Sequence, residues 1–374
     1  MATGCAAFLS RSHQRSLEEV IESRGVDPQD VVYPDRLTKE MRKWLRLRFP
    51  RQPRSEYGAY QLLEALEGAN GLDLEYESGF TGTAQDVFET RKYNCLSFSH
   101  LFLAMAREIG VDAHYLNVDR IQRFRRSGDV VLVSGHVTVG FGIGPNRRVL
   151  EYRVGPPADY KTATPISDLT AMALFYTNRG AELIQQGRYE EAVEWLVIGT
   201  RLDPALPGTW LNLGVARRRS GDLDGAEKSY LKSIALDDTF FPAYRNLASL
   251  YQLRGKGEVA AELFAVLDRR GNRNPYAFLA LGDQSLESGR TAEAEQYYRR
   301  ALRLSTDRAD AQAALGNLAL EKGRLEQAQQ WLEEARASNP ESERVEELEE
   351  RIAPSGAPAE PAGPAMHIDQ GAVD

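Results

Sequence analysis

A repeat with a fixed period of 34 residues runs through the second half of the chain and constrains the fold more than any other feature. Its most regular position is a glycine, found at Gly187, Gly221, Gly255, Gly289 and Gly323. An alanine follows each of these glycines five residues later. Such a period is typical of a solenoid, in which each repeat is a small helical unit that packs only against its neighbours.

Two further positions of the repeat differ in size. Small residues allow two antiparallel helices to approach closely, at Gly180, Gly214, Ala248, Gly282 and Gly316. Large residues fill the gap between successive helix pairs, at Leu196, Tyr230, Phe264, Tyr298 and Leu332. The pattern resembles the tetratricopeptide repeat family. It predicts five repeats over residues 173–340, which are stabilised by stacking on one another.

This resemblance implies that the repeats bind a protein or peptide in a concave groove lined by the first helix of each pair. The predicted groove includes Asn178, Asn212, Arg217, Tyr244, Asn246 and Asn317. The asparagines would hold an extended peptide backbone, as in family members that bind peptide termini. The alternative is an array that only holds two parts of one complex together.

Two short segments follow the repeats. Residues 341–353 are acidic and helix-prone, which predicts a polar capping helix over the end of the array. Residues 354–374 are rich in Pro, Ala and Gly and hold few large apolar side chains. We predict that they form a disordered tail.

The first half of the chain mixes helical periodicity with short runs typical of strands. At 374 residues the chain exceeds what one hydrophobic core usually organises, so a second structural unit is expected. The patterns predict helices within residues 17–47, over 57–67, after a capping box at 83–86 and over 95–109, and strands over 113–118, 130–133, 136–141 and 149–154. They predict an α+β domain over residues 16–165, after a flexible segment over residues 1–15.

Three residues of this domain stand where cysteine chemistry would need them. Cys95 begins a predicted helix, and His136 and Glu151 lie on predicted strands that follow it. With the stretch Thr83–Val111, they resemble the transglutaminase-like superfamily, whose fold is papain-like. The resemblance covers residues 72–154 and implies that Cys95 is the nucleophile, His136 the general base and Glu151 the orienting acid. The family usually has Asp in the third role, and Glu is one methylene longer.

Elementary chemistry supports the role of Cys95. A thiolate at a helix start faces backbone N–H groups and the positive end of the helix dipole. With a histidine partner, such a site lowers a thiol pKa from about 8.5 to roughly 3.5–7.5. The competing interpretation is a buried core thiol, because Cys95 is followed by Leu96, Phe98, Leu101 and Phe102.

The run after His136 predicts which face of its strand each side chain occupies. His136, Thr138 and Gly140 alternate with Val137, Val139 and Phe141, so the histidine projects away from the apolar face. A hairpin between this strand and the next would bring Glu151 to the level of His136. Its register cannot be read from the sequence.

Three functions are compatible with these patterns. The first is acyl transfer by a cysteine protease, amidase or transamidase, through a thioester, with the repeats recruiting a protein or peptide partner. The second is a non-catalytic scaffold, in which the N-terminal domain is degenerate and the repeats carry the function. In the third, the N-terminal domain only caps the solenoid, and Cys95 is inert.

Composition excludes some other classes. The net charge of -8 argues against nucleic acid as a partner. The basic run Arg120–Arg126 is predicted to be a solvated loop. Because HxxxH, CxxC and compact His/Asp clusters are absent from the sequence, we expect neither a metal nor a cofactor.

The first residues resemble the end of a bacterial lipoprotein signal. Small residues at positions 2–4 precede Cys5, although the charged and apolar stretch of such a signal is not in the sequence. If the true start lies upstream, we expect lipidation of Cys5 and a periplasmic, membrane-anchored protein. Otherwise we expect a cytoplasmic one, and we expect membrane contact only through that lipid.

Overall fold

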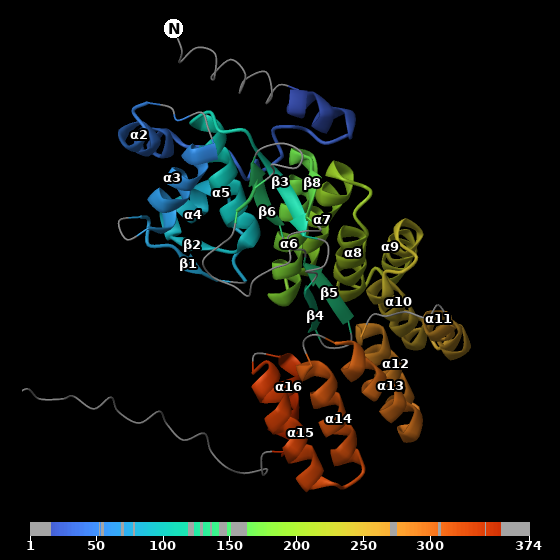
Figure 1. Ribbon diagram of the computed structural model, residues 1–374. Helices are drawn as coiled ribbons and strands as arrows, with labels where there is room; N and C mark the ends of the chain where they lie inside the picture. The colour runs from blue at the N-terminus through green and yellow to red at the C-terminus, as the bar shows by residue number, and fades with distance from the viewer. Residues whose placement is uncertain are drawn as a thin grey trace, which may run out of the picture. The chain divides into compact units, whose positions relative to one another are not determined.

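The structure is a computed structural model of the chain (Figure 1). It describes residues 16–352, apart from 52, 54–55, 69–70, 78, 119–122, 128–129, 135–136, 142–147, 151–162, 270–274, 306–307 and 341. The predicted flexible segment 1–15 and the predicted tail 354–374 lie outside the described residues. Within the described part, no helix is both long and apolar enough to cross a membrane.

The second half of the chain is helical throughout its described part, as the period predicts. The first helices of the five repeats are α6 (Asp168–Gln185), α8 (Pro207–Arg219), α10 (Phe241–Leu253), α12 (Pro275–Glu287) and α14 (Ala309–Glu321). The second helices are α7 (Tyr189–Leu202), α9 (Leu223–Leu236), α11 (Gly257–Arg269), α13 (Thr291–Leu304) and α15 (Leu325–Ser338). The predicted capping helix is α16 (Glu343–Ile352).

The small position of the repeat has the role that the sequence predicts, and in three of the repeats the large residue packs against it within the same helix pair. The repeating glycine follows each first helix with a left-handed backbone, at φ 75° for Gly187 and 92° for Gly221. A side chain there would be strained. Within each pair, a Cβ on Gly180 would collide with Leu196, and one on Gly214 with the ring of Tyr230. The side chain of Phe264 lies outside the described part.

The predicted helices of the first half are present. Residues 16–23 are helical, and α2 (Lys39–Arg48), α3 (Glu56–Glu67), α4 (Ala84–Thr90) and α5 (Cys95–Glu108) follow. Thr83 caps α4 through the predicted box with Asp86. Gly110, at φ 83°, ends α5. The apolar residues of α5 form the centre of the core of this region.

The described strands of the first half form three small sheets. The largest has the order β7-β6-β3-β8 and is antiparallel, with β3 (Ala113–Val118), β6 (Val137–Phe141), β7 (Arg148–Val149) and β8 (Ala163–Ile166). A short parallel pair joins β1 (Glu75–Tyr76) to β2 (Lys92–Tyr93). An antiparallel hairpin joins β4 (Arg123–Ser127) to β5 (Val130–Ser134). The prediction of a loop for the basic run is therefore wrong for residues 123–126, because pairing with β5 makes this segment a strand.

The chain divides into two compact units, Met1–Leu267 and Asp268–Asp374. Helix α6, in the first unit, has two roles. It begins the repeats, and it also packs in the core around α5. Arg107, in the last turn of α5, makes a paired hydrogen bond of 2.6 and 2.9 Å to Asp168 at the start of α6. The hydroxyl of Tyr176 accepts a hydrogen bond of 2.7 Å from the backbone of Val32. The first repeats are thus built into the N-terminal part.

Candidate functional site

Cys95 is the first residue of α5, as predicted, and it is neither buried nor fully exposed. The preceding residue, Asn94, has an extended backbone and caps the helix by accepting a hydrogen bond of 2.9 Å from the N–H of Ser97. The side chains that follow Cys95 are buried, with Leu96 at 1% exposure. The cysteine therefore stands at the edge of the core rather than within it.

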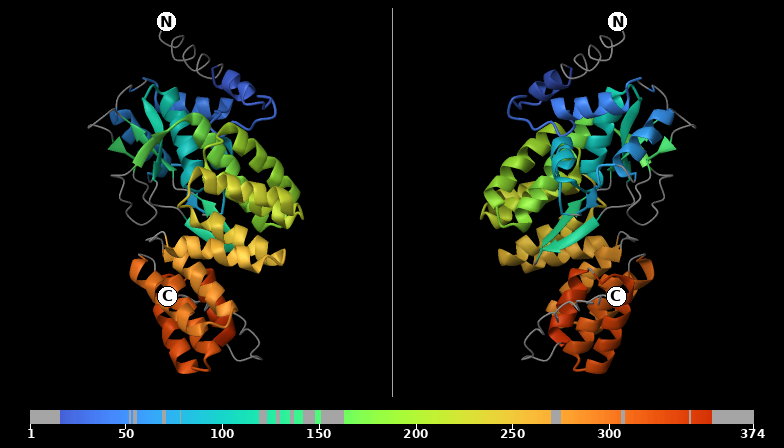
Figure 2. Two further views of the ribbon diagram at one scale, coloured as in Figure 1. Left: turned by 90° about the vertical axis from the view of Figure 1, so that its right-hand side faces the viewer. Right: turned by 90° about the vertical axis from the view of Figure 1, so that its left-hand side faces the viewer.

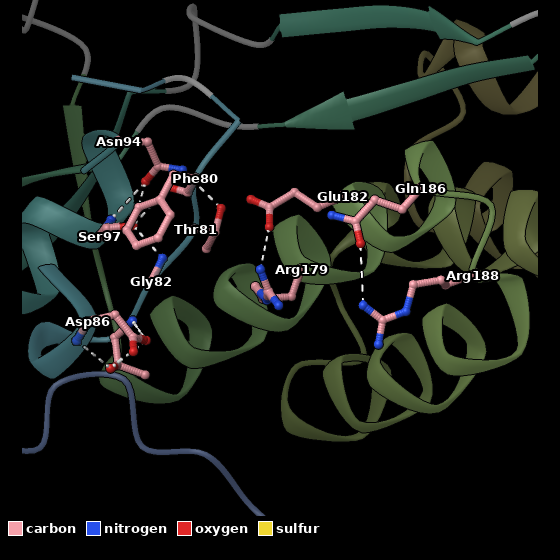
Figure 3. Close-up of polar contacts among 11 residues, drawn as sticks. Phe80, Thr81, Gly82, Asp86, Asn94, Ser97, Arg179, Glu182, Gln186 and Arg188 are labelled. Carbon is pink, nitrogen blue, oxygen red and sulfur yellow. Dashed lines mark hydrogen bonds and ion pairs between the residues drawn. The ribbon is translucent and has the colours of Figure 1, made fainter. Parts of the chain in front are cut away.

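The start of α5 is tied to the loop over residues 80–82 (Figure 3). Asn94 donates through its amide nitrogen to the hydroxyl of Thr81 at 2.9 Å. The hydroxyl of Ser97 accepts from the backbone of Gly82 at 2.9 Å and lies 3.3 Å from the carbonyl of Phe80. Asn94 and Ser97 are both buried. These bonds fix the backbone on which Cys95 sits.

The first repeat adds a carboxylate to this network. Glu182 of α6 points towards Thr81, and Arg179 lies below its carboxylate in the view of Figure 3. The side chain of Glu182 is only 11% exposed and forms an ion pair of 2.7 Å with Arg179. Burial raises the pKa of the Glu182 carboxyl, and hydrogen bonds from Thr81 together with the charge of Arg179 counteract part of that effect. A repeat helix thus meets the loop that holds the cap of α5.

Strand β6 begins beside the first turns of α5. The hydroxyl of Ser99 lies 2.7 Å from the carbonyl of Cys95 and 3.2 Å from the carbonyl of Val137. Val137, Val139 and Phe141 join the core around α5, whereas Thr138 bonds the carbonyl of Leu150 at 2.9 Å. The predicted alternation is therefore present in β6.

Two predicted members of the catalytic set, His136 and Glu151, lie outside the described residues. Their neighbours in the sequence are described. Val137 directly follows His136 and contacts Ser99, and Leu150 directly precedes Glu151 and donates to the carbonyl of Val139 at 2.8 Å. Cys95 is the described member of the set.

His100 occupies the interior of α5 and is fully buried. Its Nδ1 lies 2.7 Å from the hydroxyl of Tyr115, and its ring meets Phe175 edge-on. Burial lowers the pKa of His100 to about 3, so its imidazole is neutral at neutral pH. A buried, neutral imidazole bonded to Tyr115 is a poor candidate for a general base.

The structure places the six predicted groove residues in different environments. Asn212 and Asn246 are fully buried, with 0% exposure. Arg217 donates to Ser229 of its own repeat at 3.0 Å, and Tyr244 to the carbonyl of Asp238 at 3.1 Å. Asn317 accepts a bond of 2.7 Å from Arg351 of α16. Asn178 is half-buried on α6. In the present packing, Asn178 and Asn317 are therefore more accessible to a partner than the two buried asparagines.

Sequence reasoning did not identify Thr81, Ser99 or Glu182. Only Ser99 carries a signal, since it lies one turn after Cys95 on the same helix. The other two meet the site through tertiary packing. Within the described part of the chain, no group of three or more His, Cys, Asp or Glu residues is arranged to hold a metal ion.

Comparisons with known proteins agree with the helical architecture. Residues 177–240 and 285–352 each match a family model described as tetratricopeptide repeat. The C-terminal part of the chain is thus an all-helical solenoid of tetratricopeptide repeats, as predicted. These matches lie within residues 177–352 and do not show a transglutaminase-like domain in the N-terminal part.

One curated relative is the tetratricopeptide repeat-containing protein trd-1 of Caenorhabditis elegans, 25% identical over 210 residues. The match covers 56% of this chain and 26% of that protein, so this chain spans about a quarter of its relative's length. Among solved structures, TTC0263 of Thermus thermophilus, a thermophilic TPR protein, is 23% identical, with a TM-score of 0.41 over 48% of this chain and 97% of that one. YrrB, a TPR protein with an unusual peptide-binding site, is 16% identical, with a TM-score of 0.30 over 48% and 92%.

Proposed function

We propose that this protein is an interaction scaffold whose tetratricopeptide repeats bind a protein or peptide partner. The observation that supports this function most directly is the repeat array itself. Stacked helix pairs form an extended surface on which successive first helices present side chains at a fixed spacing. Asn178 and Asn317 are the predicted groove residues that are best placed to meet a partner.

The test is selection of peptides from a displayed library on the intact chain, followed by affinity measurements on single variants. We expect Asn178→Ala or Asn317→Ala to weaken a selected peptide about tenfold, which is about 1.4 kcal/mol. The matched control is Glu194→Ala, which removes an exposed side chain of the second helix α7. An equal loss in the control, or failure to select any peptide, would count against the scaffold.

A second function is acyl transfer at Cys95, by a transglutaminase-like domain. The observation that favours it is the half-exposed thiol at the first position of α5, where backbone N–H groups and the helix dipole stabilise a thiolate. In this proposal His136 takes the proton from the thiol and Glu151 orients the imidazole. Attack on an amide carbonyl gives a thioester and releases an amine. Water or a second amine then resolves the thioester.

The pH dependence of Cys95 alkylation tests this second function, in a Cys5→Ser background that leaves one thiol. We expect a thiol pKa well below the ordinary value of about 8.5, which rises in His136→Ala. Glu151→Gln should raise it less. A thiol that titrates normally and does not respond to His136→Ala would exclude an activated nucleophile and leave the scaffold function in place.

The lipid on Cys5 is a separate proposal, and Cys5 lies outside the described residues. Mass spectrometry of protein expressed from its genomic context tests it. A diacyl mass on Cys5 would support membrane anchoring in the periplasm, and an unmodified residue would overturn it.

A further inference from the structure

The β4–β5 hairpin, which is far from the repeats in sequence, lies on their first helices. Its two strands pair from Arg123 opposite Ser134 to Ser127 opposite Val130. Strand β5 lies against α6, α8 and α10, with Cα atoms within 8 Å. Figure 1 and Figure 2 show the hairpin leaving the N-terminal part to reach these helices. Three successive repeats therefore contribute one helix each to the contact.

These three helices define what we call the inner face, the surface formed by α6, α8 and α10. On α8, the side towards the second helix α9 is occupied by Gly214, which meets Tyr230, and by Arg217, which bonds Ser229. Leu211 and Val215 lie on another side of α8, one turn apart. Successive first helices also meet directly, since Thr177 and Thr209 lie 2.7 Å apart and Arg218 bonds Ser249 at 3.3 Å.

The burial of α8 shows that its inner side is covered. All six residues of the run 211–216 are buried. Six consecutive helical residues point around the whole circumference, so this stretch has no side open to solvent. Leu211 and Val215 are both 0% exposed. The elements around α8 are α6, α7, α9, α10 and β5.

We propose that the inner face is a binding surface for an extended polypeptide segment rich in branched aliphatic residues, and that β5 is its internal ligand. The chemistry of the ligand is read from its occupant, since β5 has the sequence Val-Val-Leu-Val-Ser over Val130–Ser134. This inference rests on the proposed scaffold function and specifies the partner for its first three repeats. An external segment of the same kind reaches the inner face only by displacing the hairpin.

The position of the hairpin in the chain gives this displacement a consequence. β5 ends at Ser134, and β6 begins three residues later at Val137, beside Ser99 of α5. In the sequence, His136 directly precedes β6. A partner that displaces β5 from the inner face therefore acts on the strand that precedes β6 in the chain, and β6 packs beside Ser99 of α5.

The test uses a synthetic peptide of residues 123–134 and two forms of the protein. One form is the intact chain. The other has residues 123–134 replaced by a short Gly/Ser linker, with circular dichroism as a check on its helix content. We expect the peptide to bind the shortened form at least about tenfold more tightly than the intact chain. In the intact chain the hairpin occupies the surface, so the apparent affinity is the intrinsic affinity multiplied by the fraction of molecules whose surface is free. A peptide with scrambled sequence is the control and should bind neither form.

Hydrogen exchange on the intact chain is the second measurement and needs no deletion. Saturating peptide should speed exchange over residues 123–134 while α8 and α10 stay protected. Equal binding of the peptide to both forms, or to neither, together with unchanged exchange of the hairpin, would overturn the inference. The scaffold function is judged separately, because peptides selected on the intact chain bind whether or not the hairpin is their competitor.

Discussion

The first helices of the two compact units are covered in opposite ways. In the first unit, α8 presents fully buried aliphatic residues, and β5 lies against it. In the second unit, the first helices α12 and α14 carry polar residues that α16 binds. Arg344 of α16 forms an ion pair of 2.6 Å with Asp283 of α12, and Arg351 bonds Asn317 and Glu321 of α14 at 2.7 and 2.6 Å.

The difference shows what the repeat determines and what it leaves open. Both units share the close approach of a glycine to a large ring, with Gly214 against Tyr230 in one and Gly282 against Tyr298 in the other. The period therefore fixes how two helices of a repeat pack. The period does not fix what covers the first helices, because the residues on their covered side differ between repeats. At equivalent positions, for example, Val215 is apolar and Asp283 is charged. Each unit covers its first helices with a different segment, β5 in the first unit and α16 in the second.

The largest expected effect comes from breaking the charged cover. Asp283 and Arg344 are 14% and 10% exposed, and Tyr298 also donates to Asp283 at 3.0 Å. Asp283→Ala leaves a buried guanidinium without its carboxylate, so we expect a loss of about 3–5 kcal/mol in the stability of the second unit. Denaturant titration, with hydrogen exchange of α12 to α16, measures it.

The control for Asp283→Ala is the double variant with Arg344→Met, which removes both charges. Most of the lost stability should return, because a buried pair is often replaced by apolar side chains at little cost. Asp224→Ala, which removes an 84% exposed partner of Arg254, should cost below about 1 kcal/mol. A small loss for Asp283→Ala would show that the charged cover is not what stabilises the second unit.

A matched pair of glycine substitutions tests what the units share. A Cβ at position 214 or 282 would strike the ring of Tyr230 or Tyr298. We expect Gly214→Ala and Gly282→Ala each to lower the free energy of unfolding by about 1–3 kcal/mol, because overpacking forces the backbone or the ring to move. The two losses should be similar. Thermal and denaturant unfolding measure both. A clearly unequal pair would mean that the cover of each unit alters the packing within its repeats.

Acid should destabilise the first unit through His100, which has no counterpart among the described residues of the second unit. Burial lowers the folded-state pKa of His100 to about 3, below the ordinary value of about 6.5. The unfolded chain then binds more protons between those values, so stability is full above about pH 6.5 and falls as the pH drops, by about 2 kcal/mol at pH 5. The described residues of the second unit hold no histidine. His100→Gln should flatten the profile of the first unit between pH 7 and 5, and a loss that persists in this variant would have another origin.

The sequence predicts elements better than contacts. The capping box at Thr83 gave the start of α4 because this signal is local. β4 was missed because its basic residues are typical of a loop, and only pairing with β5 makes it a strand. The meeting of Thr81 with Glu182 depends on packing between distant segments. The period also marked Asn212 and Asn246 without showing that their position faces the interior.

The smallest expected effect concerns the rim of the charged cover. Arg351 and Glu321 are 44% and 48% exposed, so Arg351→Ala should cost below about 1 kcal/mol, and the cost should fall towards zero as salt rises to about 1 M. The matched change in the first unit is Ser249→Ala, which removes an uncharged acceptor of Arg218 and should respond less to salt. Denaturant titrations at low and high salt compare the two.

If Arg351→Ala lowers the stability as much as Asp283→Ala, the bonds from α16 act as one cooperative network, and the exposed rim would contribute as much as the buried pair. A small, salt-sensitive loss would instead confine the stabilisation to Asp283 and Arg344, so that a partner could take Asn317 from Arg351 without loosening the second unit.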